Sequence, residues 1–371
     1  MWNANLSVCP GIAGGCHHPT SNVLPLALGQ WWLTPPRSPS RQPSGASTTA
    51  RGRRLVAGVA PAWAPTAAER TCECNATLVN GRRPFCSRSN GGEELFVYGL
   101  ATALGLSAAD GGTFVEAGGN DGWSTSNTNY LESCLGWHGA LVEPEPRTFA
   151  TMRRMRPDTL SIHSGICSAH GSSTLVRHVN RQPTGSMVME PVLLESLSSS
   201  RRFRPLQWLF TGANAERVNV PCAPLSDVFS LVGLTRVDVL FLDVEGAESE
   251  ALSSIDWEAT SVGIVSIEFT RVNTTKNRHV LRQMQTANFS LVSCVREWTG
   301  NIYDLIFIRP EHFATKNVSA EGHATLPQAA EEWLARHHAY PSHDALRCKR
   351  VAWNETERLS FEITPPKALV Q

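Results

Sequence analysis

The stretch from Thr113 to Glu143 limits the fold more than any other part of this sequence. An apolar run ends in the carboxylate Glu116 and enters the glycine-rich turn Gly118–Gly122, and a second apolar run then ends in Glu143. Glycine accepts a positive φ and lets the backbone approach a ligand closely. An acid at the end of the second strand can accept hydrogen bonds from both hydroxyls of a ribose. Together these features are typical of a nucleoside-containing cofactor site at the carboxyl edge of a doubly wound sheet.

The charge of the turn separates two classes of cofactor. A dinucleotide site has the pattern G-x-G-x-x-G, with the pyrophosphate at the helix amino terminus. Here the spacing from Gly118 to Gly122 is G-x-x-x-G, and Asp121 occupies the place of the pyrophosphate, which it would repel. S-adenosylmethionine has no phosphate and carries two cationic groups, so the pattern favours it over NAD. Taken alone, the glycine turn is equally typical of a plain strand-to-helix turn.

The second half of the chain adds further strands of the same kind. The runs VDVLFLD and VGIVSIE end in Asp243 and Glu268. Near-continuous apolar strands separated by helices predict a parallel sheet that is covered on both faces. Ligands bind outside the carboxyl ends of such strands. We therefore expect four acids to converge on one edge of the sheet: Glu116, Glu143, Asp243 and Glu268.

Five motifs in order now carry a resemblance: FVEAGGNDGWSTSNT, LESCLGWHGALVEPEP, PLSDVF, VDVLFLDVEGAESEAL and VGIVSIE. In this order they resemble the FkbM-type methyltransferases, over residues 94–310. The resemblance implies an α/β, Rossmann-like class I methyltransferase fold, with a mostly parallel doubly wound sheet and a terminal antiparallel hairpin. It also implies an S-adenosylmethionine-dependent enzyme. Members of the family mostly methylate hydroxyl groups on sugars or natural products.

Carried over position by position, the resemblance implies roles for residues at the expected edge. The cofactor-binding residues would be Glu116, Gly118, Asp121 and Gly122 around the methionine part, Asn127 with Ser126 and Thr128 facing the cofactor or acceptor, Glu143 on the ribose, and Ile166 and Cys167 beside the adenine. Of the catalytic residues, Asp243 would lie nearest the transferred methyl, and Glu245 and Glu248 would lie behind Asp243. Glu268 would lie beside the acceptor.

Methyl transfer to a hydroxyl requires an aligned oxygen and a group that takes up its proton. Asp243 is the first candidate for this general base because it ends a strand; its alternative role is a helix N-cap. Glu245 and Glu248 could orient Asp243, cap the helix through its dipole or bind Mg²⁺. Because no His-rich or Cys-rich ligand spacing accompanies them, a divalent metal stays an open alternative that we do not expect.

With 371 residues and 42% apolar content, the chain fits one core domain with extensions. Residues 1–68 contain no Asp or Glu and read as a disordered or targeting leader without a bilayer-spanning run. A Cys-containing segment, 69–93, leads into the methyltransferase domain, 94–310, whose insertion at 180–219 is a lid or a surface loop. Runs at 289–293 and 303–308 predict the hairpin, and 311–371 a helical, then irregular extension.

Two signals on the compartment disagree. An acid-free leader with Ser and Arg resembles an organelle transit peptide, and a start codon placed after a lost signal anchor gives the same appearance. The ten cysteines and six glycosylation sequons instead favour the secretory lumen, Golgi-like, with the plastid as alternative. Disulfides are expected at Cys72, Cys74 and Cys86, and buried thiols at Cys134, Cys167, Cys222 and Cys294. The sequons are at Asn5, Asn75, Asn273, Asn288, Asn317 and Asn354.

Three functional classes remain after these arguments. The first is a methyltransferase acting on a glycan or a hydroxylated small molecule, and the second is a catalytically inactive module of the same fold that binds or traffics in the secretory pathway. A nicotinamide oxidoreductase is disfavoured by Asp121. The formal net charge of zero argues against a large nucleic-acid surface. The basic run Arg153–Arg156 reads as a solvated helix face, and Trp123 as core or as a cover for the cofactor.

Overall fold

The structure is a computed structural model. It describes residues 33–34, 87–106, 111–178, 187–189, 215–270, 274–296, 302–309, 311–313, 346–352 and 360–363. The chain divides into two compact units, 1–30 and 31–371, and every described residue belongs to the second.

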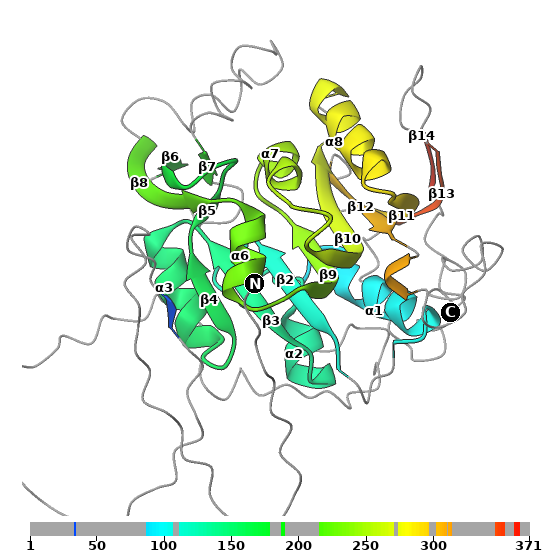
Figure 1. The fold of residues 1–371 in the computed structure, drawn as a ribbon, viewed down its shortest axis with the longest axis horizontal. Helices are drawn as coiled ribbons and strands as arrows, with labels where there is room; N and C mark the ends of the chain where they lie inside the picture. Colours follow the sequence, from blue (N-terminus) through cyan, green and yellow to red (C-terminus); the bar gives the residue numbers. More distant parts are fainter. Residues whose placement is uncertain are drawn as a thin grey trace, which may run out of the picture. The chain divides into compact units, whose positions relative to one another are not determined.

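A ten-stranded sheet forms the centre of this unit, in the order β1-β4-β3-β2-β9-β10-β12-β11-β13-β14 (Figure 1). The strands β4, β3, β2, β9 and β10 run parallel, and β12 then pairs antiparallel with both β10 and β11. The bounds are β1 Leu33–Thr34, β2 Thr113–Ala117, β3 His138–Glu143, β4 Leu160–His163, β9 Arg236–Leu242, β10 Ser261–Thr270, β11 Ser290–Arg296, β12 Ile302–Ile308, β13 Leu346–Ala352 and β14 Ser360–Ile363.

Helices cover both faces of this sheet. Alternate residues of each strand point to opposite faces, so Phe114 and Phe241 join one buried cluster, whereas Val115 and Leu240 join the other. The first cluster packs against α1 Glu93–Ala103, α2 Asn129–Leu135 and α3 Pro146–Met155. The second packs against α6 Leu225–Leu231, α7 Glu248–Ser253 and α8 Thr274–Thr286. The expected doubly wound sheet with a terminal antiparallel hairpin is confirmed.

A second, four-stranded sheet follows β4, in the order β5-β8-β6-β7. Its strands are β5 Gly165–Ile166, β6 Gly171–His178, β7 Met187–Met189 and β8 Ala215–Ala223. Sequence analysis did not predict it, because Asn219 and Pro221 inside β8 argue against a strand and the apolar alternation is short. Antiparallel pairing along the whole of β6 supplies the main-chain hydrogen bonds that β8 needs. Apart from β7 and the start of β8, the insertion at 180–219 lies outside the described residues.

Strands also occur in both extensions. β1 in the leader pairs with β4, and β13 in the C-terminal extension pairs with β11 and continues to β14. The extension was expected to be irregular after the helical part, but residues 346–352 and 360–363 add strands to the sheet. Pairing with the free edge of β11 stabilises them, and local sequence does not reveal it. The segment 311–338 was predicted to be helical; its first three residues, 311–313, form one short turn of helix, and the rest lies outside the described residues. The expected disulfides at Cys72, Cys74 and Cys86 also lie outside them.

A hydrogen-bonded group ties the hairpin to the amino ends of the parallel strands. His312 Nε2 donates to Asp238 Oδ1 at 3.0 Å, and its Nδ1 lies 2.8 Å from Ser261 Oγ. Asp238 also accepts from the backbone and hydroxyl of Thr113. Burial lowers the pKa of His312, so the neutral ring fits this network. Because the His312 side chain is fully buried, the group serves packing at the edge opposite the expected site.

Candidate cofactor and catalytic site

The carboxyl ends of four parallel strands align in one row. The ladder register places Val142, Ala117, Leu242 and Ile267 level with one another across β3, β2, β9 and β10. Two further hydrogen bonds extend it: Gly118 N donates to the Val142 carbonyl at 3.0 Å, and Asp243 N to the Ala117 carbonyl at 3.1 Å. The next residues therefore stand side by side, in the order Glu143, Gly118, Asp243, Glu268. We call these four residues the edge row.

Glu116, by contrast, is not part of the edge row. It lies two residues before Gly118, one pleat deeper in the sheet, and is 2% exposed. Its Oε1 accepts the backbone N–H of Asn127 at 2.7 Å, and its Oε2 accepts the hydroxyls of Ser126, at 3.1 Å, and of Thr128. The expected convergence of four acids is thus wrong for Glu116, because the register places it level with Leu141 and Phe241, two residues before the edge row. Its carboxylate anchors the segment before α2.

The glycine turn is shaped by its own neighbours. Gly118 has φ 91°, and a Cβ there would lie 1.8 Å from the carbonyl oxygen of Asp243. Asp121 Oδ1 accepts the backbone N–H groups of Trp123 at 2.9 Å and of Ser124 at 2.6 Å. Trp123 is buried, and the guanidinium of Arg88 lies 4.4 Å from its ring centroid. The missing Cβ of Gly118 therefore brings the turn directly against Asp243.

Glu143 is a buried carboxylate that accepts one hydrogen bond on each oxygen from the described residues. Its Oε2 accepts from Asn120 N at 3.0 Å and its Oε1 from Glu145 N at 2.8 Å. Burial raises its pKa well above the usual range, and the charges of Asp121 and Glu245 add to this. Each carboxylate oxygen can accept two hydrogen bonds. Both oxygens can therefore accept one more hydrogen bond each, as the two hydroxyls of a ribose require.

The other end of the edge row is strongly acidic. Burial raises the pKa of Glu268 well above the usual range, and the charges of Asp243, Glu245, Glu248 and Asp304 raise it further. Asp304 of β12 lies directly opposite Glu268 of β10 in the antiparallel ladder. Glu245 affects the pKa of both Glu143 and Glu268, so the row forms one electrostatic neighbourhood.

The three acids that follow β9, Asp243, Glu245 and Glu248, have different surroundings. The N-cap of α7 is Ala247, so the alternative role of Asp243 as a helix N-cap is wrong. Glu245 is exposed with φ 51°. Glu248, the first residue of α7, accepts from Gly246 N at 2.8 Å and pairs with Lys276 of α8. Within the described ranges, no group of three or more His, Cys, Asp or Glu side chains is arranged to hold a metal ion.

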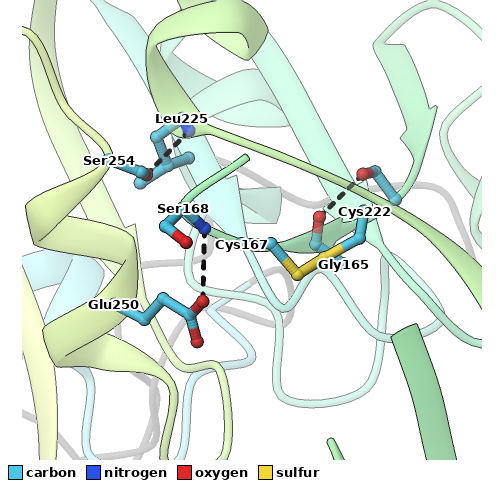
Figure 2. Close-up of a disulfide and its surroundings, with 8 residues drawn as sticks. Gly165, Cys167, Ser168, Cys222, Leu225, Glu250 and Ser254 are labelled. Atoms are coloured by element: carbon cyan, nitrogen blue, oxygen red, sulfur yellow. Dashed lines mark hydrogen bonds between the residues drawn. A yellow bond between two sulfur atoms is a disulfide. The ribbon is translucent and has the colours of Figure 1, made fainter. Parts of the chain in front are cut away.

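The expected adenine side contains a disulfide. Ile166 is buried in β5, and Cys167 bonds to Cys222 of β8, with 5.6 Å between their Cα atoms (Figure 2). The prediction of buried thiols is therefore wrong for this pair, because pairing of β5 with β8 brings the two cysteines together. It is also wrong for Cys134 and Cys294, which are disulfide-bonded as well. Ser168 N donates to Glu250 Oε1 of α7 at 3.2 Å.

Several buried charged residues were not predicted from the sequence, and Arg156 and Glu145 are two of them. Arg153 and Arg154 are exposed, as the solvated face predicts, but Arg156 is 4% exposed and pairs with Glu132, which corrects that prediction. Nothing in the local pattern marks Arg156 as buried. Glu145 caps α3 and pairs with Arg177 of β6. An acid before the Pro that opens α3 is a recognisable N-cap signal.

The topology and the edge row define a class I methyltransferase-like α/β domain. Residues 116–291 match the family model of the methyltransferase FkbM domain. This segment contains the whole edge row, and it is an FkbM-type methyltransferase domain. No curated protein sequence matches the chain.

Several solved methyltransferase structures are similar in part. A TehB-like SAM-dependent methyltransferase from Corynebacterium glutamicum has a TM-score of 0.30 and 12% identity, over 58% of this chain and 87% of that one. Aeropyrum pernix fibrillarin with bound S-adenosyl-L-methionine has a TM-score of 0.33 and 11% identity, over 62% and 86%. A Bacillus cereus O-methyltransferase in complex with SAH has a TM-score of 0.32 and 10% identity, over 67% and 93%.

Proposed function

We propose that this protein is an S-adenosylmethionine-dependent methyltransferase that methylates a hydroxyl group of a glycan or of a small hydroxylated molecule. The observation that carries the proposal is the edge row, which lies inside the segment that matches the methyltransferase family. Its acids stand at the carboxyl edge of the parallel strands, where ligands bind in such folds.

The charges of the edge row fit the cofactor. When bound, S-adenosylmethionine supplies an electrophilic methyl group on a sulfonium ion and also carries an ammonium group. The acids that raise the pKa of Glu143 and Glu268 would attract these cations and repel a pyrophosphate. Glu143 would accept the ribose hydroxyls, and Asn127, whose side chain is partly exposed, would contact the cofactor. Ile166 and Cys167 would lie beside the adenine.

Two neighbouring acids would divide the proton chemistry. Asp243, next to Gly118, would accept the proton that the acceptor hydroxyl loses as its oxygen bonds to carbon. The raised pKa of Glu268 favours its protonated form, which would donate a hydrogen bond and orient the acceptor oxygen. Two neighbouring carboxyl groups in an active site commonly take such different roles. Glu245 is exposed behind Asp243 and would not take up the proton itself.

The same acids bear on the class of acceptor. An anionic acceptor would be repelled by Asp243, Glu245 and Glu268, whereas an uncharged hydroxyl would not. This supports a neutral glycan or hydroxylated small molecule. The Cys167–Cys222 disulfide supports an oxidising compartment, and we propose the secretory lumen on that ground. In the part of the chain that the structure describes, no helix has the length and apolar content to cross a bilayer.

Calorimetric titration of the full chain tests the cofactor. S-adenosylmethionine should bind in the micromolar range, and NAD should not. Glu143→Gln should weaken the binding, whereas the matched variant Glu258→Gln, at an exposed position after α7, should not. No binding by a folded wild-type chain would overturn the proposal.

Turnover tests the chemistry. Methyl-labelled S-adenosylmethionine is incubated with a panel of neutral hydroxylated acceptors, and label transfer is measured. Asp243→Asn should abolish transfer, whereas S-adenosylmethionine should still bind, with an affinity lowered only by the loss of one attracting charge. Glu268→Gln, which keeps a hydrogen-bond donor, should retain part of it. A cofactor-binding chain that methylates no acceptor would instead support the catalytically inactive module.

A further inference from the structure

Arg156 lies between the two segments that border the edge row. It ends α3, and its side chain is 3% exposed. Its Nη1 donates to the carbonyl of Gly122 and to the hydroxyl of Ser126, both at 3.3 Å, and its Nη2 donates to Thr128 Oγ1 at 3.3 Å. Its Nε pairs with Glu132 of α2. One buried guanidinium therefore joins the end of the glycine turn to the segment that precedes α2.

Glu116 holds the same segment from the other side. The hydroxyls of Ser126 and Thr128 accept from Arg156 and donate to the carboxylate of Glu116. Between them, the backbone N–H of Asn127 donates to Glu116. The two hydroxyls thus form a bridge between a buried cation and a buried anion, and Asn127 is fixed at the middle of that bridge.

The bridge has an electrostatic consequence for Glu116. Burial raises the pKa of this carboxyl, and the charge of Arg156 is the largest effect that lowers it. The charged groups on this side are Arg156 from α3 and, beyond it, Glu132 from α2. A buried carboxylate that loses its cation takes up a proton instead of staying charged. Removing Arg156 would therefore favour the protonated form of Glu116 and weaken its hold on Asn127.

Gly122 shows that the turn is built around this side chain. Its φ is 76°, and a Cβ there would lie 3.0 Å from Arg156 Cγ and 3.0 Å from Met152 Cγ. That is closer than ordinary van der Waals contact. The absence of a side chain at Gly122 therefore makes room for α3 and Arg156, so the glycine and the arginine depend on each other.

We propose that Arg156 is a positioning residue of the cofactor site, which holds Gly122 and Asn127 in the arrangement that binds S-adenosylmethionine. This inference rests on the proposed function. It does not place Arg156 in contact with the cofactor; the residue acts through the turn, through Asn127 and through Glu116. A merely structural role would lower thermal stability and leave the pH dependence of binding unchanged.

The test measures S-adenosylmethionine affinity by calorimetry against pH for the full chain and its variants. Arg156→Met should weaken binding roughly 10- to 100-fold, which is the range for outer-shell residues that orient the side chains of a metal site. It should also shift the acid midpoint of binding to higher pH, because Glu116 then protonates more easily. Arg156→Lys keeps the charge without the planar fork, so it should weaken binding with a midpoint close to wild type. Arg153→Met, an exposed change on the same helix, should alter neither quantity.

A double variant isolates the route of the effect. In a Glu116→Gln background, Arg156→Met should no longer shift the acid midpoint. Wild-type affinity and an unmoved midpoint in Arg156→Met would overturn the inference while leaving the proposed function intact. Absence of cofactor binding in the wild-type chain would overturn the proposed function first. If Arg156→Met fails to fold, Arg156→Lys decides: weakened binding supports the inference, and wild-type affinity overturns it.

Discussion

Substituting Gly118 by alanine tests whether the glycine turn and β9 meet as the structure shows. At φ 91° an alanine is strained, which costs about 1–2 kcal/mol in a left-handed conformation. The new Cβ would lie 1.8 Å from the Asp243 carbonyl oxygen, which belongs to the backbone and cannot rotate away. Forcing atoms into such a packed contact costs about 1–3 kcal/mol more. The free energy of unfolding should fall by roughly 2–5 kcal/mol in total.

Gly136 supplies the matched control. It also has a positive φ, 67°, but a Cβ there meets no atom within 4 Å. Gly136→Ala should therefore cost only the conformational strain, about 1–2 kcal/mol. Thermal unfolding should separate the two variants by roughly 2–12 °C, since each kcal/mol shifts the Tm of such a domain by about 2–4 °C. Gly118→Ala should also weaken cofactor binding, because Asp243 must move. Equal Tm values for the two variants would refute the contact.

Three further predictions concern stability and modification. Because the pKa of Glu268 in the fold lies above its usual 4.5, stability is lost as pH rises through the folded pKa. Glu268→Gln should therefore raise the Tm at neutral pH and leave it unchanged at acid pH below 4.5, in a series of thermal melts. Cys167→Ser should lower the free energy of unfolding by about 4 kcal/mol in denaturant titrations, because it opens a loop of 55 residues. If the chain passes through the secretory pathway, Asn288, exposed after α8, should carry a glycan, and Asn288→Gln should remove its mass.

The central sheet could be predicted because its signals are local. The apolar runs that become β2, β3, β9 and β10 end in acids or glycines, and strand hydrophobicity with helices between them determines a parallel sheet. The four-stranded sheet and β13 could not be predicted in this way. Their longer strands, β6, β8 and β13, are rich in polar residues, and they form because a partner edge offers hydrogen bonds, which no local pattern encodes. The disulfide to Cys222 has the same origin, since β5 and β8 are far apart in sequence.

The sequence predicted the edge of the sheet where the acids lie, but not the surroundings of each residue. Strand ends correctly placed Glu143, Asp243 and Glu268 in one row, because the register of parallel strands follows from their hydrophobic pattern. The same rule failed for Glu116, since a strand boundary is uncertain by a residue or two and two residues make one pleat. Arg156 could not be found at all. Its burial depends on how α3 packs over the glycine turn.

Glu116 and Glu268 look alike in the sequence, since each follows an apolar strand, but the fold treats them differently. Glu116 accepts from two hydroxyls and a backbone N–H, and these hydrogen bonds together with the charge of Arg156 offset the cost of burying its charge. The side chain of Glu268 makes no hydrogen bond or ion pair within the described part of the chain, and the charges that raise its pKa are all acids. A protein retains such an uncompensated acid at a cost in stability, which a functional site commonly explains. The comparison therefore supports a scaffold role for Glu116 in the proposed site. It leaves Glu268 as the carboxyl group for which a ligand would supply the missing partner.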